Sequence, residues 1–145
     1  MDKCYILSVK NVLLLVTTQL ILLKITRKNS MKTILWLDDI RDPRRSPWTA
    51  MLNEIAPSAE TITWVKNYEA FVEYIDTKGL PDLVCFDNDL AEEKEGYDCA
   101  KYLVNYCMNM GLPAPRFICQ SSNRPAVENI TALLNNYNKF VSALK

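Results

Sequence analysis

Residues 33–43 read T-I-L-W-L-D-D-I-R-D-P, and this stretch decides the fold class. Five apolar or β-branched residues, from Thr33 to Leu37, lead directly into the adjacent carboxylates of Asp38 and Asp39. A short apolar run bounded by polar residues is typical of a strand that is covered on both faces. Adjacent carboxylates repel each other, so their place at the end of this strand suggests more than a turn.

Three further runs share this strand character: residues 61–65, 83–86 and 116–119. Apolar residues at helical spacing separate the runs, at 68–77, 96–110 and 125–144, and one more short helix is expected at 48–56. Strands and helices thus alternate along the chain. This order predicts a three-layer α/β fold, with a parallel sheet of about four strands and helices on both faces.

The first thirty residues differ from the rest of the chain. They carry five lysines and arginines against one aspartate, a net charge of +4, and residues 12–25 are mostly leucine, valine and isoleucine. That apolar run falls short of the roughly 20 residues that a membrane span needs. Three interpretations stay open: an upstream start used in place of Met31, a membrane anchor or signal-like segment, or an element packed on the domain. We therefore divide the chain into a hydrophobic, basic extension at 1–30 and a domain at 31–145, with membrane contact expected only if the extension is genuine.

Composition excludes some classes of function. The full chain of 145 residues has no net charge, so residues 31–145 carry a net charge of −4. An acidic domain argues against an extended nucleic-acid surface, but it leaves room for a local site that binds a nucleotide or an RNA end. The three glycines form neither a Walker A loop nor a G-x-G-x-x-G motif.

The cysteines favour a reduced compartment. Their number is odd, no C-x-x-C pair occurs, and the chain has no histidine that could activate a thiol. We expect inert thiols without a disulfide partner and a cytoplasmic location. The five are Cys4, Cys85, Cys99, Cys107 and Cys119.

Polar residues gather where three of the predicted strands end. Asp38 and Asp39 follow the first strand, residues 87–89 read D-N-D after the third, and residues 120–123 read Q-S-S-N after the fourth. Any one cluster alone is typical of a turn or a helix N-cap. Together they would meet at one edge of a parallel sheet, where a hard cation resolves carboxylate repulsion. Arg41 and the first turn of the last helix could bind a phosphate beside that cation.

These residues resemble the receiver domain of two-component signalling. In a receiver, an acidic pair after the first strand holds Mg²⁺, and an aspartate after the third strand accepts a phosphoryl group. Asp38, Asp39 and Asp87 match those positions, and Ser121 or Ser122 follows the fourth strand. A receiver also has a fifth strand followed by a lysine, for which this sequence shows no counterpart. We therefore expect a receiver-like, or flavodoxin-like, sheet that lacks the fifth strand.

A closer resemblance is to the cyclic-phosphate processing receiver-like family, a divergent branch of that fold. Four motifs occur in the order of the family pattern: L-D-D-I-R-D-P at 37–43, F-D-N-D-L at 86–90, G-Y-D at 96–98 and S-S-N-R-P at 121–125. Asn88 stands where the family usually has a histidine between two aspartates. Asparagine donates and accepts hydrogen bonds but does not titrate near neutrality.

The resemblance implies metal-dependent hydrolysis of cyclic phosphates or nucleotide-derived phosphoesters. Mg²⁺ or Mn²⁺ would be held by Asp38, Asp39 and Asp87, and catalysis would involve Asp39, Asp87 and Asp89. Asp89 would serve as general base or support the metal ligands, and Asp87 could instead be a nucleophile. The phosphate would be bound by Arg41, Asn88, Ser121, Ser122 and Asn123. The substrate would be a cyclic phosphate, a nucleotide or an RNA end.

Two other functions stay open at this point. One is a binding module that responds to phosphorylation of Asp87, which the missing lysine disfavours. The other is a catalytically inactive module that binds a ligand or a protein in the same pocket, which Asn88 in place of histidine favours. Whether the protein is an enzyme is thus left undecided by the sequence.

Overall fold

The computed structural model describes residues 2–145, with side chains described for residues 9–22 and 30–145. The chain divides into two compact units, Met1–Met31 and Lys32–Lys145. The first contains one helix, α1 (Asp2–Asn29), whose side chains at 9–22 are all exposed; the Cys4 side chain lies outside the described residues. Among the described residues, no helix has the length and apolar character required to cross a membrane.

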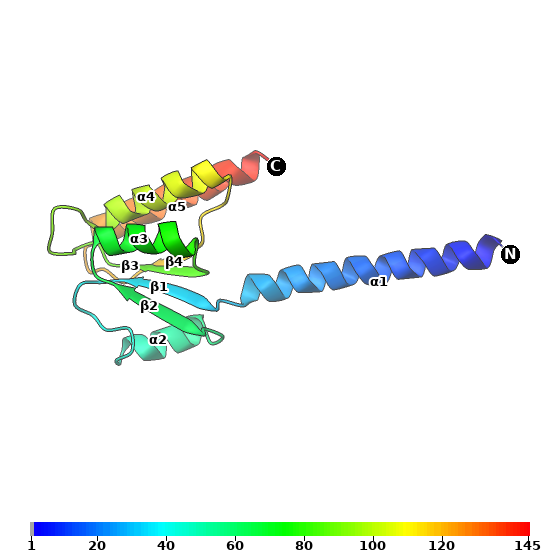
Figure 1. Cartoon of the computed structure of the whole chain (residues 1–145), viewed down its shortest axis with the longest axis horizontal. Helices are drawn as coiled ribbons and strands as arrows, with labels where there is room; N and C mark the ends of the chain where they lie inside the picture. The colour runs from blue at the N-terminus through cyan, green and yellow to red at the C-terminus, as the bar shows by residue number, and fades with distance from the viewer. Residues whose placement is uncertain (1) are drawn as a thin grey trace. The chain divides into compact units, whose positions relative to one another are not determined.

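The second unit is built on a four-stranded parallel sheet with the order β2-β1-β3-β4 (Figure 1). The strands are β1 (Thr33–Leu37), β2 (Thr61–Val65), β3 (Leu83–Phe86) and β4 (Arg116–Cys119). These bounds are those predicted from the apolar runs. The parallel, four-stranded α/β architecture is therefore confirmed, and the described residues contain no fifth strand.

Helices cover both faces of the sheet, as Figure 1 shows. One face carries α2 (Trp48–Ile55), and the other carries α3 (Tyr68–Lys78), α4 (Gly96–Met110) and α5 (Arg124–Ala143). Successive side chains of β1 point to opposite faces of the sheet. Leu35 and Leu37 pack in the main core with α3, α4 and α5. Trp36 packs on the other face against Trp48 of α2, with 5.7 Å between the ring centroids. Because both faces are covered, β1 is apolar and buried from Ile34 to Leu37.

Local capping explains where the helices begin and end. The Asn67 and Asn123 side chains accept hydrogen bonds from the first turns of α3 and α5, at 2.8 and 3.2 Å. Glu95 and Asp98 form a capping box at the start of α4, and Gly111, with a φ of +66°, ends that helix in the left-handed conformation.

The strand order brings two loops together. β1 lies between β2 and β3, and Leu37 is paired in register with Phe86. The residues that follow these two, Asp38 and Asp87, therefore leave neighbouring strands at the same edge. This is the point where the strand order reverses, which is where open α/β sheets bind ligands.

Candidate functional site

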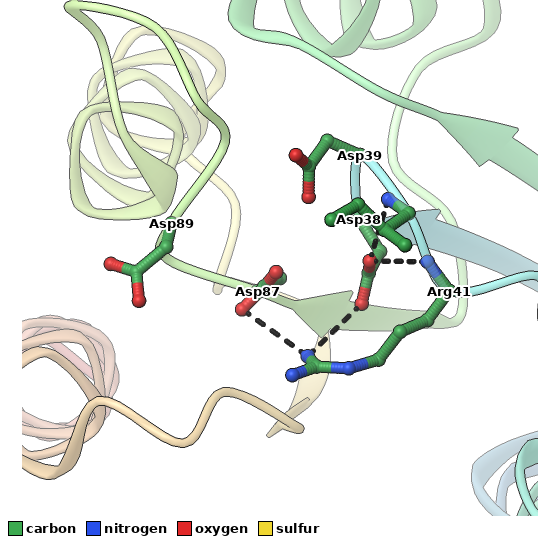
Figure 2. Close-up of a pocket in the computed structure, with 6 residues that line it drawn as sticks. Asp38, Asp39, Arg41, Asp87 and Asp89 are labelled. Carbon is green, nitrogen blue, oxygen red and sulfur yellow. Dashed lines mark hydrogen bonds and ion pairs between the residues drawn. The ribbon is translucent and has the colours of Figure 1, made fainter.

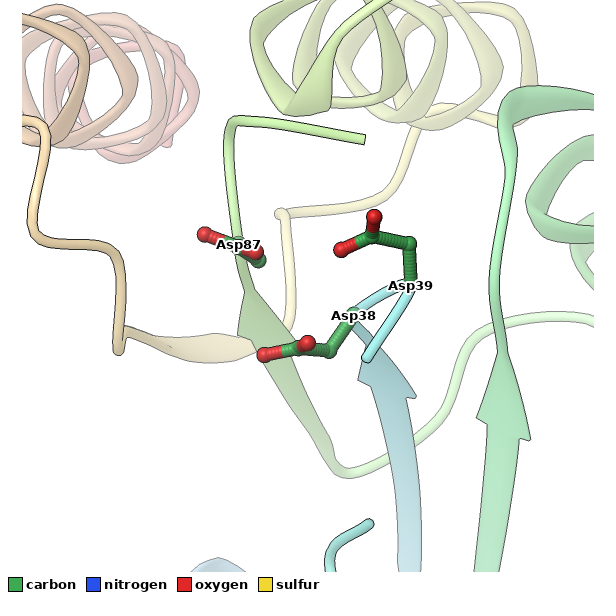
Figure 3. Close-up of side chains that lie close together, drawn as sticks. All are labelled: Asp38, Asp39 and Asp87. Atoms are coloured by element: carbon green, nitrogen blue, oxygen red, sulfur yellow. The ribbon is translucent and has the colours of Figure 1, made fainter. Parts of the chain in front are cut away.

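Three carboxylates meet at this edge of the sheet. One oxygen from each of Asp38, Asp39 and Asp87 can be chosen so that all three lie within 4.8 Å of one another (Figure 3). Asp38 is fully buried and Asp87 is 5% exposed, whereas Asp39 is half-buried. The three line a cavity of about 320 Å³ together with Ile40, Arg41 and Asp89 (Figure 2). The close approach predicted for Asp38, Asp39 and Asp87 is thus present in the structure.

Hydrogen bonds hold Asp38 from several sides. Its Oδ1 accepts the backbone N–H groups of Ile40 at 3.1 Å and Arg41 at 2.7 Å, so the side chain closes the turn that follows β1. Its backbone N–H donates to the carbonyl of Val65, and its carbonyl accepts the indole N–H of Trp64 at 2.6 Å. The position of Asp38 is therefore set by β2 as well as by β1.

The Arg41 guanidinium lies between two of the carboxylates. Its Nη1 is 3.3 Å from Asp38 Oδ2 and 3.5 Å from Asp87 Oδ1 (Figure 2). The same nitrogen is 3.4 Å from the backbone carbonyl oxygen of Gln120. The Trp36 indole N–H donates to the Arg41 carbonyl at 2.9 Å and fixes the loop behind it. Arg41 therefore supplies the charge that balances part of this cluster.

The surroundings of Asp87 disfavour its charged form. Burial raises the pKa of its carboxyl above the ordinary value, and the nearby charge of Asp38 raises that pKa further. Arg41, the Ser121 hydroxyl and the Asn88 backbone N–H lower the pKa of Asp87, but they do not reverse the shift. A set of carboxylate oxygens with this excess of negative charge fits a hard divalent cation.

Asn88 does not line the cavity. It is 1% exposed, and its Nδ2 donates to Asp89 Oδ1 at 3.2 Å and to Glu95 Oε2 at 3.0 Å. Its Oδ1 accepts the backbone N–H of Tyr97 at 3.1 Å. The side-chain amide predicted to bind phosphate is therefore engaged with the loop between β3 and α4.

The predicted residues after β4 divide into three cases. Ser121 is hydrogen-bonded to Asp87. Asn123 donates to Asp89 at 3.2 Å while it caps α5. Ser122 is exposed, and none of the three residues lines the cavity. Only the first two are thus tied to the carboxylates.

The G-Y-D motif has a structural explanation in both of its outer residues. A Cβ at Gly96 would lie 1.9 Å from the Asp87 carbonyl oxygen, so only glycine allows α4 to begin against the end of β3. The Asp98 carboxylate accepts the Glu95 backbone N–H at 2.9 Å, as part of the capping box. Both residues fix the start of α4 next to the end of β3, and neither lines the cavity.

Two contributors to the site were missed by reasoning from the sequence. Gln120 Nε2 donates to the Leu37 backbone carbonyl at 3.0 Å. The backbone carbonyl of Gln120 accepts a hydrogen bond from Arg41 Nη1. Trp64 holds the Asp38 backbone, as described above. The sequence places Gln120 among the polar residues directly after the fourth strand but gives it no role, and an indole inside a strand gives no signal of this kind.

A model of the cyclic-phosphate processing receiver domain family matches residues 33–136. The chain belongs to this family. The match includes every carboxylate in the cavity, Arg41 and the capped start of α5. The general role of the domain in cyclic-phosphate processing follows from this membership. Asp38, Asp39 and Asp87 are the residues that could hold a metal.

Other comparisons add less. Among solved structures, one similar chain is a fusion that contains the yeast Spc42 trimeric coiled coil, amino acids 181–211, at 24% identity and a TM-score of 0.45. The match covers 70% of the present chain and 63% of the other. No curated protein matches the sequence.

Proposed function

We propose that the protein hydrolyses cyclic phosphates, or related nucleotide-derived phosphoesters, with the help of Mg²⁺ or Mn²⁺. The observation that carries this proposal is the meeting of Asp38, Asp39 and Asp87 beside the Arg41 guanidinium, in a chain that belongs to a cyclic-phosphate processing family. Carboxylates suited to a cation and a guanidinium suited to a phosphate then lie in one cavity.

The roles of the side chains follow from their positions. Asp38, Asp39 and Asp87 would hold the cation, which when bound lowers the pKa of a water molecule and polarises a phosphoryl oxygen. Arg41, freed from its ion pairs by the cation, would bind the phosphate through two parallel N–H groups. Ser121, hydrogen-bonded to Asp87, would orient that ligand.

Asp89 lines the same cavity without belonging to the close set of three, which suits a group that acts on the proton. In the proposed reaction the oxygen of water bonds to phosphorus, and one ester P–O bond of the cyclic phosphate breaks. Asp89 accepts one proton of the water, and the leaving alkoxide oxygen takes up a proton from solvent water. One water is consumed and a phosphomonoester is formed.

A basic and aromatic surface beside the cavity supports a nucleotide as substrate. Lys66 Nζ lies 4.3 Å from the centroid of the Trp64 ring, and Arg44 Cζ lies 6.0 Å from it. Both cations are exposed, and Trp64 is joined to Asp38 by its indole hydrogen bond. Exposed cations over an aromatic ring suit the phosphate of a nucleotide, and the ring would stack with its nucleobase once a cation moves from the ring face to that phosphate.

The test is an assay of the full chain with 2′,3′-cyclic nucleotides and cyclic phosphate-ended RNA, in Mg²⁺ or Mn²⁺ and in a chelator. We expect phosphomonoester product that depends on the cation and is lost in Asp87→Ala. Asp76→Ala is the matched control, because Asp76 is exposed on α3 and accepts its hydrogen bond from Tyr102, outside the cavity lining. No turnover with any of these substrates, or turnover that survives Asp87→Ala, refutes the proposal.

The same preparations separate the two alternatives. A mass increase at Asp87 after treatment with acetyl phosphate would indicate a phosphorylation-responsive module. Cation binding in a calorimeter without turnover would indicate an inactive binding module. No lysine lines the cavity among the described residues, so the structure offers no counterpart of the receiver lysine there.

A further inference from the structure

Asp89 is exposed, yet two side-chain amides hold it. Its Oδ1 accepts one hydrogen bond from Asn88 Nδ2 and one from Asn123 Nδ2, each at 3.2 Å. The donors come from different segments, the end of β3 and the start of α5. A carboxylate on a loop samples several rotamers, and two fixed donors on one oxygen select a single orientation.

Asn88 is itself fixed. It is almost fully buried, its Oδ1 accepts the Tyr97 backbone N–H, and its second Nδ2 hydrogen bond goes to Glu95. Its backbone carbonyl accepts the Gly96 N–H at 2.9 Å. The amide is therefore tied to the first turn of α4, which is packed against the end of β3.

Asn123 is fixed by the other helix. Its Oδ1 accepts the Ala126 backbone N–H at 3.2 Å, and its own backbone N–H donates to Ser121 Oγ at 3.1 Å. Asn123 therefore connects Asp89 with the start of α5, as Asn88 connects it with the start of α4. The two amides hold the carboxylate at the rim of the cavity from two rigid elements.

Amides are suited to this task for a chemical reason. Each must accept a backbone N–H with one atom and donate to Asp89 with the other, and neither changes charge with pH. An aspartate at position 88 would instead face the carboxylates of Asp89 and Glu95 without a donor. The side chain at position 88 is turned into the loop, where it contacts Glu95 and Tyr97. Asparagine in place of histidine at this position therefore leaves the proton-transfer groups of the cavity unchanged.

We propose that Asn88 and Asn123 are positioning residues that act on the reaction through Asp89. This inference rests on the proposed function of the cavity. Neither amide touches the substrate: together they hold Asp89 Oδ1, so that the carboxylate meets the attacking water in one orientation.

The first experiment observes the contact directly and needs no turnover. In ¹⁵N-labelled full-length protein, the side-chain NH₂ signals of Asn88 and Asn123 are assigned with Asn88→Ala and Asn123→Ser. In Asp89→Ala both signals are expected to shift and to exchange faster with solvent. If Asp89→Ala leaves both NH₂ signals unchanged, the proposed contact is wrong, whether or not the protein hydrolyses cyclic phosphates.

The second experiment is a double-mutant cycle on kcat and KM with Asn88→Ala and Asp89→Asn. Asn88→Ala is expected to lower kcat roughly 10- to 100-fold with little change in KM, the usual loss for a residue that orients a functional group. In the Asp89→Asn background the same change is expected to have no further effect. Full additivity of the two effects would overturn the inference.

A matched pair separates positioning from helix capping. Asn123→Ser and Asn67→Ser both keep an oxygen that can cap a helix, α5 and α3 respectively. Only the first removes a donor to Asp89, so only Asn123→Ser is expected to lower kcat. Equal loss in both variants would assign the effect to capping. If the wild type turns over no substrate while the NH₂ signals respond, the proposed function fails and the contact stands.

Discussion

Arg41→Gln tests whether the protein's own cation competes with a metal for the same carboxylates. In the described structure Arg41 Nη1 lies 3.3 Å from Asp38 Oδ2 and 3.5 Å from Asp87 Oδ1. The two carboxylate side chains are only 1% and 7% exposed, whereas Arg41 is 32% exposed. Glutamine keeps some length and hydrogen-bonding capacity but removes the charge.

The magnitude follows from these contacts. Both are longer than the 2.7–2.9 Å of a strong charge-assisted hydrogen bond, and solvent reaches the guanidinium. Each therefore contributes at or just below the lower limit for hydrogen bonds to charged groups, about 1 to 1.5 kcal/mol. We expect Arg41→Gln to lower the unfolding free energy of the metal-free protein by about 2 to 3 kcal/mol. At about 4 °C per kcal/mol for a domain of this size, Tm falls by about 8 to 12 °C.

The affinity for a divalent cation should change in the opposite direction, because Arg41→Gln should strengthen cation binding while it destabilises the metal-free fold. In wild type a divalent cation must displace Arg41 from the carboxylates or lie beside its charge, whereas in Arg41→Gln these carboxylates are unpaired. If the full 2 to 3 kcal/mol is recovered on binding, Kd for Mn²⁺ falls by about 30- to 150-fold. The addition of Mn²⁺ should then raise Tm more in the variant than in wild type.

Urea unfolding and calorimetric titration with Mn²⁺ measure both effects. Arg45→Gln is the control, because Arg45 is 85% exposed and its Nε lies 3.8 Å from Asp42, outside the cavity lining. That variant should leave unfolding and Mn²⁺ affinity unchanged. An Arg41→Gln variant that binds Mn²⁺ as weakly as wild type, or more weakly, would refute the competition.

Three other predictions concern the surroundings of the cavity. Gly96→Ala should lower the unfolding free energy by about 3 kcal/mol or more in urea titrations, because its Cβ would lie 1.9 Å from the Asp87 carbonyl oxygen. Gly111→Ala, at a positive φ but in open space, should lower it by only about 1 to 2 kcal/mol. Equal losses in the two variants would contradict this explanation. Asp87→Asn should stabilise the metal-free protein at neutral pH, because the raised pKa of Asp87 means that folding favours its protonated form. The gain in unfolding free energy should disappear as the pH falls through that pKa. Urea unfolding from about pH 8 to about pH 4 that shows the same difference in unfolding free energy throughout would refute it. Iodoacetamide should leave the thiols of Cys85 and Cys99 unmodified in the native protein, since burial raises the pKa of both, and peptide mass spectrometry that finds them alkylated without unfolding would contradict their placement.

The strands could be predicted to the residue because each is an uninterrupted apolar run that ends in polar side chains. Their parallel order follows from the alternation with helices, and this order is enough to bring Asp38 and Asp87 to one edge. Leu37 and Phe86 are register partners, so the residues after them had to be neighbours. The edge of the sheet that carries the acidic cluster could therefore be predicted, whereas the pairing of β1 with β3 and its register come from the structure.

The directions of the side chains were not available in the same way. A strand alternates its side chains between two faces, but this rule stops where the strand stops. Asn88 lies two residues after β3, in a loop whose path is set by the contact of Gly96 with the Asp87 and Asn88 backbone. Its amide is thus turned toward Glu95 and Tyr97 and away from the cavity. Motif matching assigns a residue to a site, whereas the local turn decides which atoms reach it.

Arg41 also bears on how the domain can fold before it meets a metal. Asp38 and Asp87 leave neighbouring strands with buried carboxylates, and two buried charges of the same sign are strongly unfavourable without a partner. Arg41 lies three residues from Asp38 on the same loop, so folding of β1 and its turn brings the balancing charge with the first carboxylate. The sheet can then close with Asp87 in place and no ion bound. The same contact makes Arg41 a competitor of the cation, so a metal-free fold and tight metal binding oppose each other at this one guanidinium.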